Sequence, residues 1–521
     1  MDFDTSPTPN NLERLCELRK RALAGGGEKR QQAQHEGGKL TARERLDILL
    51  DKDSFEEFGA FILPHTNEDD LDKEEYPGDA VITGTGKIDG RRVFIFAQDF
   101  TIHGGSISEV VGLKVSRLMQ LATENLAPVI AIVDSGGARI QEGVVGLAGV
   151  GNILCAHALA SGVVPQISII AGPSAGGAVY GPAITDFTFM VEGIGQMYIA
   201  GPNAVKAATH EEISHQDLGG VFVHADQSGV AHFTNNTEEG CYREVRRLLS
   251  FLPQSWREKP PYHPLGDDPG RTDNTLRTII PDPPNQPYDM KQVIASIVDQ
   301  SDFLEVHRRY APNILVGFAR LDGHTVGIVG QQPSELAGVI DINAADKAAR
   351  FIRYCDAFNI PLVSLVDSPG FLPGSDQERH GIIRHGAKLI FAYAEATVPK
   401  VSVILRKAYG GAYIVMSSKH LRGDINLAWP GAEIAVMGAS GAVNITSRRT
   451  IATATNPALV RDRLIREYEE RFNNPYIAAA RGYIDDVIDP AESRPKIIRA
   501  LDMLRHKDQR NPPCKHSSIP L

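Results

Sequence analysis

Two pairs of adjacent glycines are the residues best suited to chemistry in this chain of 521 residues. Gly176 and Gly177, like Gly410 and Gly411, come shortly after an apolar segment of the kind that forms a buried strand. Glycine lets a ligand approach the backbone closely, and adjacent N–H groups that point at one place form an oxyanion hole. One such donor typically contributes about 2.7–4 kcal/mol of transition-state stabilisation. We therefore predict that both pairs bind negative charge and are more than tight strand–helix turns.

Glycines also follow an earlier strand in each half of the chain. Gly136 and Gly137 come after the apolar segment 129–133, and Gly370 comes after the segment 362–366. In α/β proteins ligands bind at the loops that follow the carboxyl ends of parallel strands, where helix N-termini offer free N–H groups. The recurrence of glycine at matching places favours a binding function.

Other motifs are weaker. Gly172 to Gly176 satisfies the G-x-S-x-G pattern of a serine hydrolase with Ser174 as nucleophile, but the matching turn in the second half has no serine. His210 and His215 are five residues apart, whereas a zinc helix needs a spacing of four, so no metal is expected. No acid–base pair stands out. A reaction run by backbone N–H groups, with the base supplied by a cofactor, fits that absence.

The elements that must position these loops occur twice. Residues of the first half recur 233 positions later, and the matches include Gly84, Gln98, Gly105, Pro128, Asp134, Ser135 and Gly137. With one inserted residue, Gly176-Gly177-Ala178 then matches Gly410-Gly411-Ala412. Chance identities scatter over many separations, so the sequence predicts a tandem duplication.

Each half is predicted to alternate strands and helices in the same order. The segments are a hairpin strand (93–97; 326–329), a helix (109–126; 344–358), a buried strand (129–133; 362–366), a further helix and a last strand (167–170; 401–405). This alternation indicates an α/β fold with a largely parallel sheet. Nine of the 32 prolines lie between 253 and 287. We expect domains at 12–255 and 290–510, joined by a Pro-rich linker at 256–289.

Helices are also expected in the stretch 11–51, with a break at the three glycines 25–27. Thr41 and Glu44 have the spacing of a capping box, which predicts a helix after Leu40. Lys39, Arg43 and Arg45 lie around this helix start. A solvated basic face is the preferred interpretation of these residues, and contact with a phosphate is the alternative.

The composition excludes several classes of protein. Apolar residues make up 42% and charged residues 23% of the chain, which is ordinary for a globular protein. The formal net charge is −10, whereas binding to nucleic acid or to an anionic membrane requires a basic surface. The stretch 143–185 has no charged residue but is rich in glycine, which favours a buried core or subunit interface over a membrane hairpin. No nucleic-acid or membrane partner is expected.

The cysteines and the first residues bear on the compartment. The five cysteines are far apart and form no CxxC pair, so neither a zinc nor a disulfide framework is predicted and a reducing compartment is indicated. The first residues lack the basic and apolar regions of a signal peptide. We therefore expect a cytoplasmic location.

Longer motifs around the glycines resemble the carboxyltransferase (β) subunit of biotin-dependent acyl-CoA carboxylases of the propionyl-CoA and acetyl-CoA type. The motifs are GGKLTARER (37–45), QDFT (98–101), DSGGARIQEG (134–143), GGAVY (176–180), DSPGFLPG (367–374) and RKAYGGAY (406–413). The likeness runs from about residue 12 to the C-terminus, so it covers nearly the whole chain.

The resemblance implies two crotonase-like (ClpP/crotonase) domains and a homo-hexamer built as a dimer of trimers. In that family the active sites form between the N-half of one subunit and the C-half of another. The implied cofactor is biotin, as carboxybiotin on a carrier protein, with no metal in this subunit. Biotin carboxylase and biotin carboxyl carrier subunits are expected as partner chains, because this sequence has no biotin-attachment segment and no room for an ATP-grasp domain.

The implied reaction carboxylates acyl-CoA without a protein base. Carboxybiotin releases CO₂, the ureido nitrogen takes the α-proton of the acyl group, and the enolate attacks CO₂. One oxyanion hole maps to Gly176 and Gly177 and the other to Gly411 and Ala412, although the repeat leaves open that the first lies one residue later, at Gly177 and Ala178. Acyl-CoA binding is implied for Gly104, Gly105, Gly136, Gly137 and Ala138, and biotin binding for Gly338, Gly370, Phe371, Tyr409 and Gly410.

One departure from the family pattern concerns substrate choice. Ile414 stands where propionyl-type members usually carry Asp, and this suggests a pocket that accepts acetyl-CoA as well as propionyl-CoA. Three alternatives remain. A methylmalonyl-CoA decarboxylase subunit uses the same site in reverse with a membrane partner, a serine hydrolase would use Ser174, and a non-catalytic scaffold would share only the fold.

Overall fold

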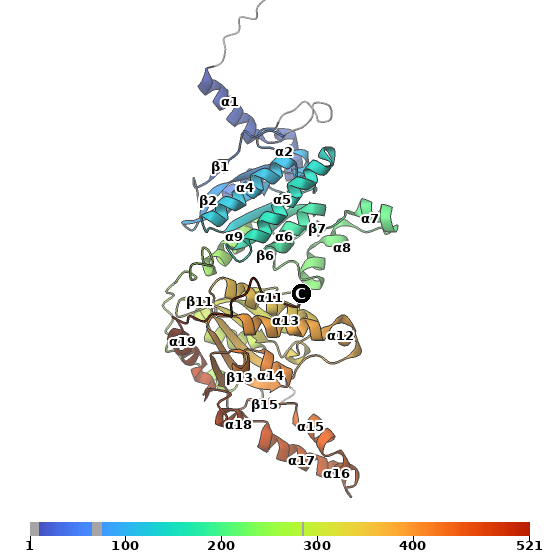
Figure 1. Cartoon of the computed structure of the whole chain (residues 1–521), viewed down its shortest axis with the longest axis vertical. Helices are drawn as coiled ribbons and strands as arrows, with labels where there is room; N and C mark the ends of the chain where they lie inside the picture. Colours follow the sequence, from blue (N-terminus) through green and yellow to red (C-terminus); the bar gives the residue numbers. More distant parts are fainter. Residues whose placement is uncertain (1–9, 65–75, 284–285) are drawn as a thin grey trace, which may run out of the picture. The chain divides into compact units, whose positions relative to one another are not determined.

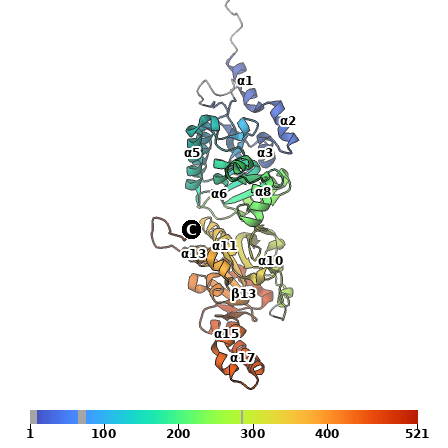
Figure 2. The same cartoon turned by 90° about the vertical axis from the view of Figure 1, so that its right-hand side faces the viewer.

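The structure, a computed structural model, describes residues 10–64, 76–283 and 286–521. It divides into two compact units, each with its own sheet and helices (Figures 1 and 2). Unit 1 contains the described residues up to Ser250 and Gln254–Arg257, and unit 2 contains Phe251–Pro253 and Glu258–Leu521. The limits predicted for the linker, 256–289, stay a prediction.

The sheet of unit 1 has the strand order β1-β2-β3-β4-β5-β6-β8, with β7 beside β5. Strand β2 is antiparallel to both of its neighbours, β1 and β3, and the pairs from β3 to β8 are parallel. The strands are β1 (Glu56–Phe58), β2 (Val81–Ile88), β3 (Arg91–Gln98), β4 (Val129–Ser135), β5 (Gln166–Ala175), β6 (Phe187–Val191), β7 (Gln196–Tyr198) and β8 (Phe233–Asn235).

Helices of unit 1 precede and cover this sheet. They are α1 (Asn11–Ala24), α2 (Glu28–Glu36), α3 (Ala42–Leu49), α4 (Glu109–Glu124), α5 (Val144–Ala160), α6 (Tyr180–Ile184), α7 (Pro202–Thr209), α8 (His215–Gly219) and α9 (Glu238–Phe251). Helix α4 begins at the N-cap Ser108 and buries Val111, Val115 and Leu118 at helical spacing. These side chains join those of β3 and β4 in one hydrophobic core.

Unit 2 repeats the arrangement. Its sheet has the order β9-β10-β11-β12-β13-β14-β16, with β15 beside β13. The strands are β9 (Phe303–Val306), β10 (Ile314–Leu321), β11 (His324–Gln331), β12 (Leu362–Ser368), β13 (Lys400–Tyr409), β14 (Ile425–Ala428), β15 (Glu433–Ala435) and β16 (Asp486–Val487). The helices are α10 (Met290–Ile297), α11 (Ile342–Ala357), α12 (Ser375–His380), α13 (Ile382–Glu395), α14 (Gly411–Val415), α15 (Ala439–Thr446), α16 (Arg448–Ala452), α17 (Pro457–Phe472), α18 (Pro475–Ala480) and α19 (Ser493–Met503).

The predicted fold class, an α/β tandem duplication, is confirmed. In both sheets seven strands follow one another in the same order, and an eighth strand pairs with the corresponding central strand, β5 in unit 1 and β13 in unit 2. The two hairpin turns also match, because Asp89 and Asp322 both have positive φ and each is followed by a glycine with positive φ. The predicted strands and helices lie within or nearly coincide with the observed elements of both units.

The N-terminal helices agree with the sequence in their limits. The glycines 25–27 separate α1 from α2, and Gly25 and Gly27 have positive φ. Thr41 and Glu44 form the predicted capping box at the start of α3.

Among the described residues no helix is both long and apolar enough to cross a membrane. Helix α5, in the charge-free stretch, buries one side and exposes Val144, Leu147 and Leu159 on the other.

Candidate active site

The first glycine pair lies where β5 ends and a short helical segment begins. Gly176 has a φ of 57°, in the left-handed region that favours glycine. It opens the 3₁₀ segment η3 (Gly176–Val179), which leads directly into α6. Amides in the first turn of a helix have no partner within that helix. The N–H groups of Gly177 and Ala178 can therefore donate to an anion.

Two loops of unit 1 are bonded to each other next to this turn. Gly136 donates its N–H to the carbonyl oxygen of Gly104 at 2.9 Å, and Ile107 donates to the carbonyl oxygen of Gly137 at 2.7 Å. Ile107 also forms an isolated β-bridge with Ala138. The loop after β4 is thereby fixed against the loop before α4.

Close backbone approaches explain why glycine is needed in these loops. A Cβ at Gly105 would lie 2.0 Å from the carbonyl oxygen of Asp134, and a Cβ at Gly137 would lie 2.6 Å from that of Ala175, the residue before the turn. The structure thus brings together the residues that the resemblance implied for acyl-CoA and the first hole, which are Gly104, Gly105, Gly136, Gly137, Ala138, Gly176 and Gly177.

The second glycine pair lies where β13 ends in unit 2. Gly410 has a φ of 55° and donates its N–H to the carbonyl oxygen of Ala435 at 2.9 Å. Gly411 begins α14, so its N–H and that of Ala412 lie in the first turn. The ring of Phe371 lies against the turn, 3.1 Å from where a Cβ at Gly411 would be.

The remaining predicted residues of unit 2 surround this turn. Ile340 donates its N–H to the carbonyl oxygen of Gly370 at 3.0 Å and bridges Phe371. A Cβ at Gly338 would lie 2.6 Å from the carbonyl oxygen of Asp367. Ile414 lies on α14, one turn after Gly411, and its side chain is 44% exposed. The structure therefore brings together Gly338, Gly370, Phe371, Tyr409, Gly410, Gly411, Ala412 and Ile414.

The strand registers fix which residues of the two turns correspond. In unit 1 Ser135 is paired with Ser174, and in unit 2 Ser368 is paired with Ala408. Counting from these pairs, Gly176 corresponds to Gly410, and Gly177 and Ala178 correspond to Gly411 and Ala412. The shared φ of 57° and 55° at the two leading glycines supports this alignment. Of the two positions considered for the first hole, the later one, Gly177 with Ala178, matches the second turn.

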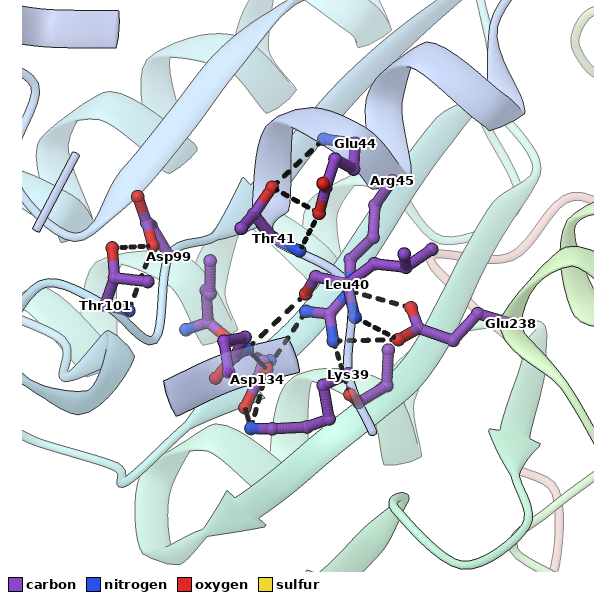
Figure 3. Close-up of polar contacts among 12 residues, drawn as sticks. Lys39, Leu40, Thr41, Glu44, Arg45, Asp99, Thr101, Asp134 and Glu238 are labelled. Atoms are coloured by element: carbon purple, nitrogen blue, oxygen red, sulfur yellow. Dashed lines mark hydrogen bonds and ion pairs between the residues drawn. The ribbon is translucent and has the colours of Figure 1, made fainter. Parts of the chain in front are cut away.

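A buried network of charges lies beneath the first site (Figure 3). The Asp134 carboxylate accepts from the Arg45 guanidinium at 3.0 Å and from the Lys39 Nζ at 3.1 Å. The other side of Arg45 contacts the Glu238 carboxylate at 2.8 Å, and Glu238 also accepts the N–H of Leu40 at 2.9 Å. Burial opposes the charge on Arg45, yet the two carboxylates hold its pKa above the usual value. This network fixes the residue immediately before the loop Ser135–Ala138.

Our prediction that Lys39, Arg43 and Arg45 form a solvated basic face is wrong. The Arg45 side chain is fully buried, and its two carboxylate partners come from β4 and α9. Lys39 is 12% exposed and lies 4.0 Å from the centroid of the Phe100 ring. Arg43 is a quarter exposed and pairs with Glu57 at 3.0 Å. The three cations are structural partners of carboxylates.

Asp367 occupies the same place in unit 2 but takes its cation from another element. The Arg406 Nε donates to it at 3.0 Å, and the N–H of Lys407 donates at 3.0 Å. Burial raises the pKa of Asp367, and Arg406 opposes that shift. The sequence repeat identified the matching aspartates Asp134 and Asp367, but it did not indicate which cations pair with them.

A tyrosine–carboxylate pair lies beside the second turn and was also missed. The Tyr409 hydroxyl donates to the Glu433 carboxylate, which also accepts from the Asn473 amide at 3.3 Å. Burial, together with the Glu433 carboxylate, raises the pKa of Tyr409 well above its usual value. Glu433 is on β15, whose Ala435 holds the N–H of Gly410. The pair therefore links Tyr409, the residue before the turn, to β15, the strand that holds the turn.

Two buried lysines recur at the repeat separation and hold backbone carbonyls. The Lys114 Nζ donates to the carbonyl oxygens of Gly78 and Val81, both at 2.6 Å. The Lys347 Nζ donates to three carbonyl oxygens of the segment 307–311, the nearest at 2.7 Å. Burial lowers the pKa of Lys114 to about 8 and that of Lys347 to about 7. Their separation of 233 residues was the sequence signal that could have found them.

The hydrolase motif lacks the geometry of a nucleophile. Ser174 is fully buried within β5, and its hydroxyl donates to the carbonyl oxygen of Ala178 at 3.1 Å. Gly172, the first glycine of the motif, leaves room for a neighbouring side chain, because a Cβ at this position would lie 2.0 Å from the Asp134 carboxylate. Nor do the described residues include three His, Cys, Asp or Glu side chains placed to hold a metal ion.

Comparison with known proteins places these features in a context. The family described as "Carboxyl transferase domain" matches residues 33–519. The chain is 54% identical over 512 residues to a propionyl-CoA carboxylase carboxyltransferase subunit of Haloferax mediterranei, covering 98% of this chain and 99% of that one. It is 51% identical over 510 residues to the methylmalonyl-CoA decarboxylase subunit alpha of Veillonella parvula, covering 98% and 99%. A crystal structure of transcarboxylase 12S, a hexamer with methylmalonyl-coenzyme A bound, superposes with a TM-score of 0.96 at 48% identity over the full length of both chains.

Proposed function

Since this chain belongs to the carboxyl transferase family, as a carboxyltransferase subunit of the acyl-CoA carboxylase type, we propose that it carboxylates propionyl-CoA. The carboxyl group comes from carboxybiotin on a carrier protein and goes to the α-carbon, giving methylmalonyl-CoA. The observation that carries the proposal is the recurrence of one glycine turn, with the same left-handed glycine and the same two first-turn amides, in both units. The reaction has two oxygens on which negative charge develops, and the fold offers two such turns.

The first turn is assigned to the acyl thioester. When the α-proton leaves, charge moves to the thioester oxygen, and the N–H groups of Gly177 and Ala178 donate to that oxygen. The loop of Gly137 packs against this turn and is bonded to the loop of Gly104, and this supports the assignment of the CoA-binding role to the same side of unit 1. Because the donors are fixed by the backbone, they need no reorganisation as the charge develops.

The second turn is assigned to biotin. The chemistry that biotin supplies is the carboxyl group itself and a ureido nitrogen that accepts the α-proton. The residues present fit this group, because Gly410 and Gly411 carry no side chains and Phe371 offers an apolar ring beside them. The N–H groups of Gly411 and Ala412 would donate to the ureido oxygen. No protein base is needed, because the ureido nitrogen accepts the proton.

The acyl group accepted is a finer part of the proposal. Ile414 lies on α14, one turn beyond the second pair of amides, with an exposed side chain. An apolar residue there, in place of the Asp typical of propionyl-type members, would relax the choice between acyl groups. We therefore include acetyl-CoA as a second substrate.

The working assembly is also part of the proposal. The similarity to transcarboxylase 12S over the full length of both chains supports a hexamer of this chain, built as a dimer of trimers. Exposed apolar residues on α5 support burial of this surface against other subunits. Biotin carboxylase and the carrier domain would be supplied by partner chains. The five unpaired cysteines support a reducing compartment, and we propose the cytoplasm.

A second candidate is supported by the 51% identity to a methylmalonyl-CoA decarboxylase subunit alpha. That function would use the same two turns in the opposite direction. The two candidates differ in the partner chains. A carboxylase needs a biotin carboxylase that consumes ATP and bicarbonate, whereas the decarboxylase acts with a membrane partner.

The assay that tests the proposal uses the purified, assembled chain. Methylmalonyl-CoA or malonyl-CoA is mixed with biocytin, and formation of propionyl-CoA or acetyl-CoA is followed. We expect biocytin-dependent turnover of methylmalonyl-CoA, and slower turnover of malonyl-CoA. No biocytin-dependent turnover of either substrate by an intact hexamer would overturn the proposal. Co-purification from the native source then separates carboxylase from decarboxylase.

A further inference from the structure

A small cavity lies next to the first glycine turn. Its volume is about 20 Å³, and Gly177 and Ala178 form part of its wall. Val150, Ile153 and His157 of α5 also line it. Helix α5 packs closely on the turn, because a Cβ at Gly177 would lie 2.7 Å from the Cγ1 of Val150. We call this space the turn cavity, since it borders the two residues whose N–H groups are assigned to the acyl thioester.

The buried His157 presents a hydrogen-bond acceptor on one side of its ring. The amide nitrogen of Gln166 donates to the carbonyl oxygen of His157 at 3.1 Å, so the Gln166 Oε1 is the atom that faces the ring Nδ1, at 2.8 Å. An amide oxygen only accepts, so Nδ1 carries the ring proton. Burial lowers the pKa of His157, although the bond to Gln166 opposes this shift. The ring is therefore neutral, and its Nε2 has a free lone pair.

The Nε2 of His157 is directed to the turn cavity. It lies 3.3 Å from where a Cβ at Gly181 would be, and Gly181 also lines the cavity. The part of the chain that the structure describes supplies no donor to this nitrogen. Because His157 is 1% exposed, bulk solvent does not supply one freely either. Buried polar atoms are usually bonded to protein or to an ordered water.

Gln98, on β3, brings a donor to the same cavity. Its Oε1 accepts the N–H of Asp134 at 3.3 Å, and its Nε2 has no acceptor among the described residues. The matching Gln331 of unit 2 accepts the N–H of Asp367 at 3.1 Å, but its Nε2 is sealed from any bound molecule. The Nε2 atoms of Gln98 and His157 are not sealed in this way. The turn cavity thus borders one unbonded donor and one unbonded acceptor.

The size and the lining of the turn cavity suit a single water molecule. A buried water needs about 10–15 Å³ and two to four polar partners, and the turn cavity offers about 20 Å³ with a donor and an acceptor. We propose that one water binds here, accepts from the Gln98 Nε2 and donates to the His157 Nε2. Through this bridge His157 and Gln98 act as positioning residues for the N–H groups of Gly177 and Ala178.

The effect on the reaction rests on the function proposed for the first turn. A water held by two hydrogen bonds keeps the backbone of Gly177 and Ala178 from shifting into the turn cavity, and such a bridge is nearly as favourable in enthalpy as a direct hydrogen bond. A displacement of about 1 Å at a reacting centre can lower the rate about 10²-fold. The charge that these N–H groups bind develops in the transition state. Loss of the bridge should therefore lower kcat and leave KM unchanged.

The water itself is tested without any turnover. In a crystal structure of the assembled chain that shows ordered waters, we expect one density peak in the turn cavity, about 2.7–3.2 Å from the Nε2 atoms of His157 and Gln98. His157→Phe should lack the peak. Absence of the peak from wild type would overturn the proposal. If wild type has the peak but no carboxyl-transfer activity, the function proposed for the turn fails and the water site stands.

Two variants of His157 separate the bridge from simple packing. His157→Phe keeps a ring and removes the acceptor, whereas His157→Gln loses the ring and keeps an acceptor at the end of the side chain. In the assay of methylmalonyl-CoA with biocytin, we expect kcat to fall roughly tenfold in His157→Phe and no more than about threefold in His157→Gln, with KM unchanged in both. A packing role alone predicts the reverse order.

The control is a buried hydrogen bond in unit 2. Tyr393→Phe removes a fully buried hydroxyl that bonds to the Ser364 Oγ at 2.8 Å, and it should leave kcat unchanged. Thermal unfolding verifies that each variant folds, and kcat is expressed per folded chain. The proposal is overturned if His157→Phe retains as much kcat as His157→Gln, or if the substitutions raise KM and leave kcat unchanged.

Discussion

Arg406 in unit 2 occupies the position that Gly172 occupies in unit 1. The strand registers align the two residues, and each lies four positions before the leading glycine of its turn, Gly176 or Gly410. Arg406 neutralises the buried Asp367 at 3.0 Å. At Gly172 even a Cβ would lie 2.0 Å from the matching carboxylate, Asp134, whose cations come instead from Arg45 and Lys39. The duplicated units keep the buried aspartate and differ in where its counter-charge originates.

This relationship predicts that Gly172→Ala is destabilising. The added methyl group must displace the Asp134 carboxylate from its network, and overpacking of this kind costs about 1–3 kcal/mol. The matched control is Gly431→Ala, where nothing lies within 4 Å of the new Cβ, and it should change stability by less than about 0.5 kcal/mol. Urea unfolding measures both. Equal stability of Gly172→Ala and wild type would show that Asp134 is not held as described.

The buried Lys347 predicts a specific pH dependence. Burial lowers its pKa to about 7, from 10.5 for an unperturbed lysine. Between these two pKa values the unfolded chain binds a proton that the folded chain does not, so the free energy of unfolding rises with pH. Below pH 7 Lys347 is protonated in both states, and the full free-energy cost of burying the charged lysine is present. Relative to Lys347→Met, wild type should gain about 1 kcal/mol per pH unit between pH 7 and 10. The exposed Lys87→Met serves as control and should show no such trend. A constant difference between wild type and Lys347→Met would contradict the prediction.

Tyr409 and Glu433 are predicted to act as one unit beside the second turn. Removing either partner frees the other and loosens the strand that holds Gly410, so Tyr409→Phe and Glu433→Ala should each lower kcat roughly tenfold or more. The double variant should be little worse than either single one, because both remove the same contact. Glu433→Gln keeps an acceptor and should retain more activity than Glu433→Ala. Multiplicative losses in the double variant would mean that the two residues act independently.

Ile414 is predicted to set the choice between acyl groups. The ratio of kcat/KM for propionyl-CoA over acetyl-CoA should rise about tenfold or more in Ile414→Asp, because a difference of one methylene is worth about 1–3 kcal/mol in a matched pocket. The exposed Ile445→Asp, on α15, is a control for the added charge. An unchanged ratio in Ile414→Asp would remove Ile414 from the specificity pocket.

The duplicated fold and the glycine turns could be predicted from the sequence, whereas the charge networks could not. Glycine pairs after apolar segments, repeated at one separation, carry local information about backbone conformation, and Gly176 and Gly410 have the left-handed φ that glycine permits. Arg45 could not be placed in this way. Its partners lie 89 and 193 residues away, and a basic residue beside a capping box has the same local pattern whether it is solvated or buried. Only the tertiary fold brings Asp134 and Glu238 to it.

The most direct test of the central claim removes a single N–H from the second turn. Gly411 is the first residue of α14, where proline is tolerated, so Gly411→Pro deletes the donor with little cost to the helix. Gly411→Ala adds a Cβ against Phe371 but keeps the N–H, and it controls for the steric change. In assembled hexamers, we expect kcat for carboxyl transfer to fall about 10²–10³-fold more in Gly411→Pro than in Gly411→Ala. Equal kcat values in the two variants would contradict the claim that this turn stabilises negative charge.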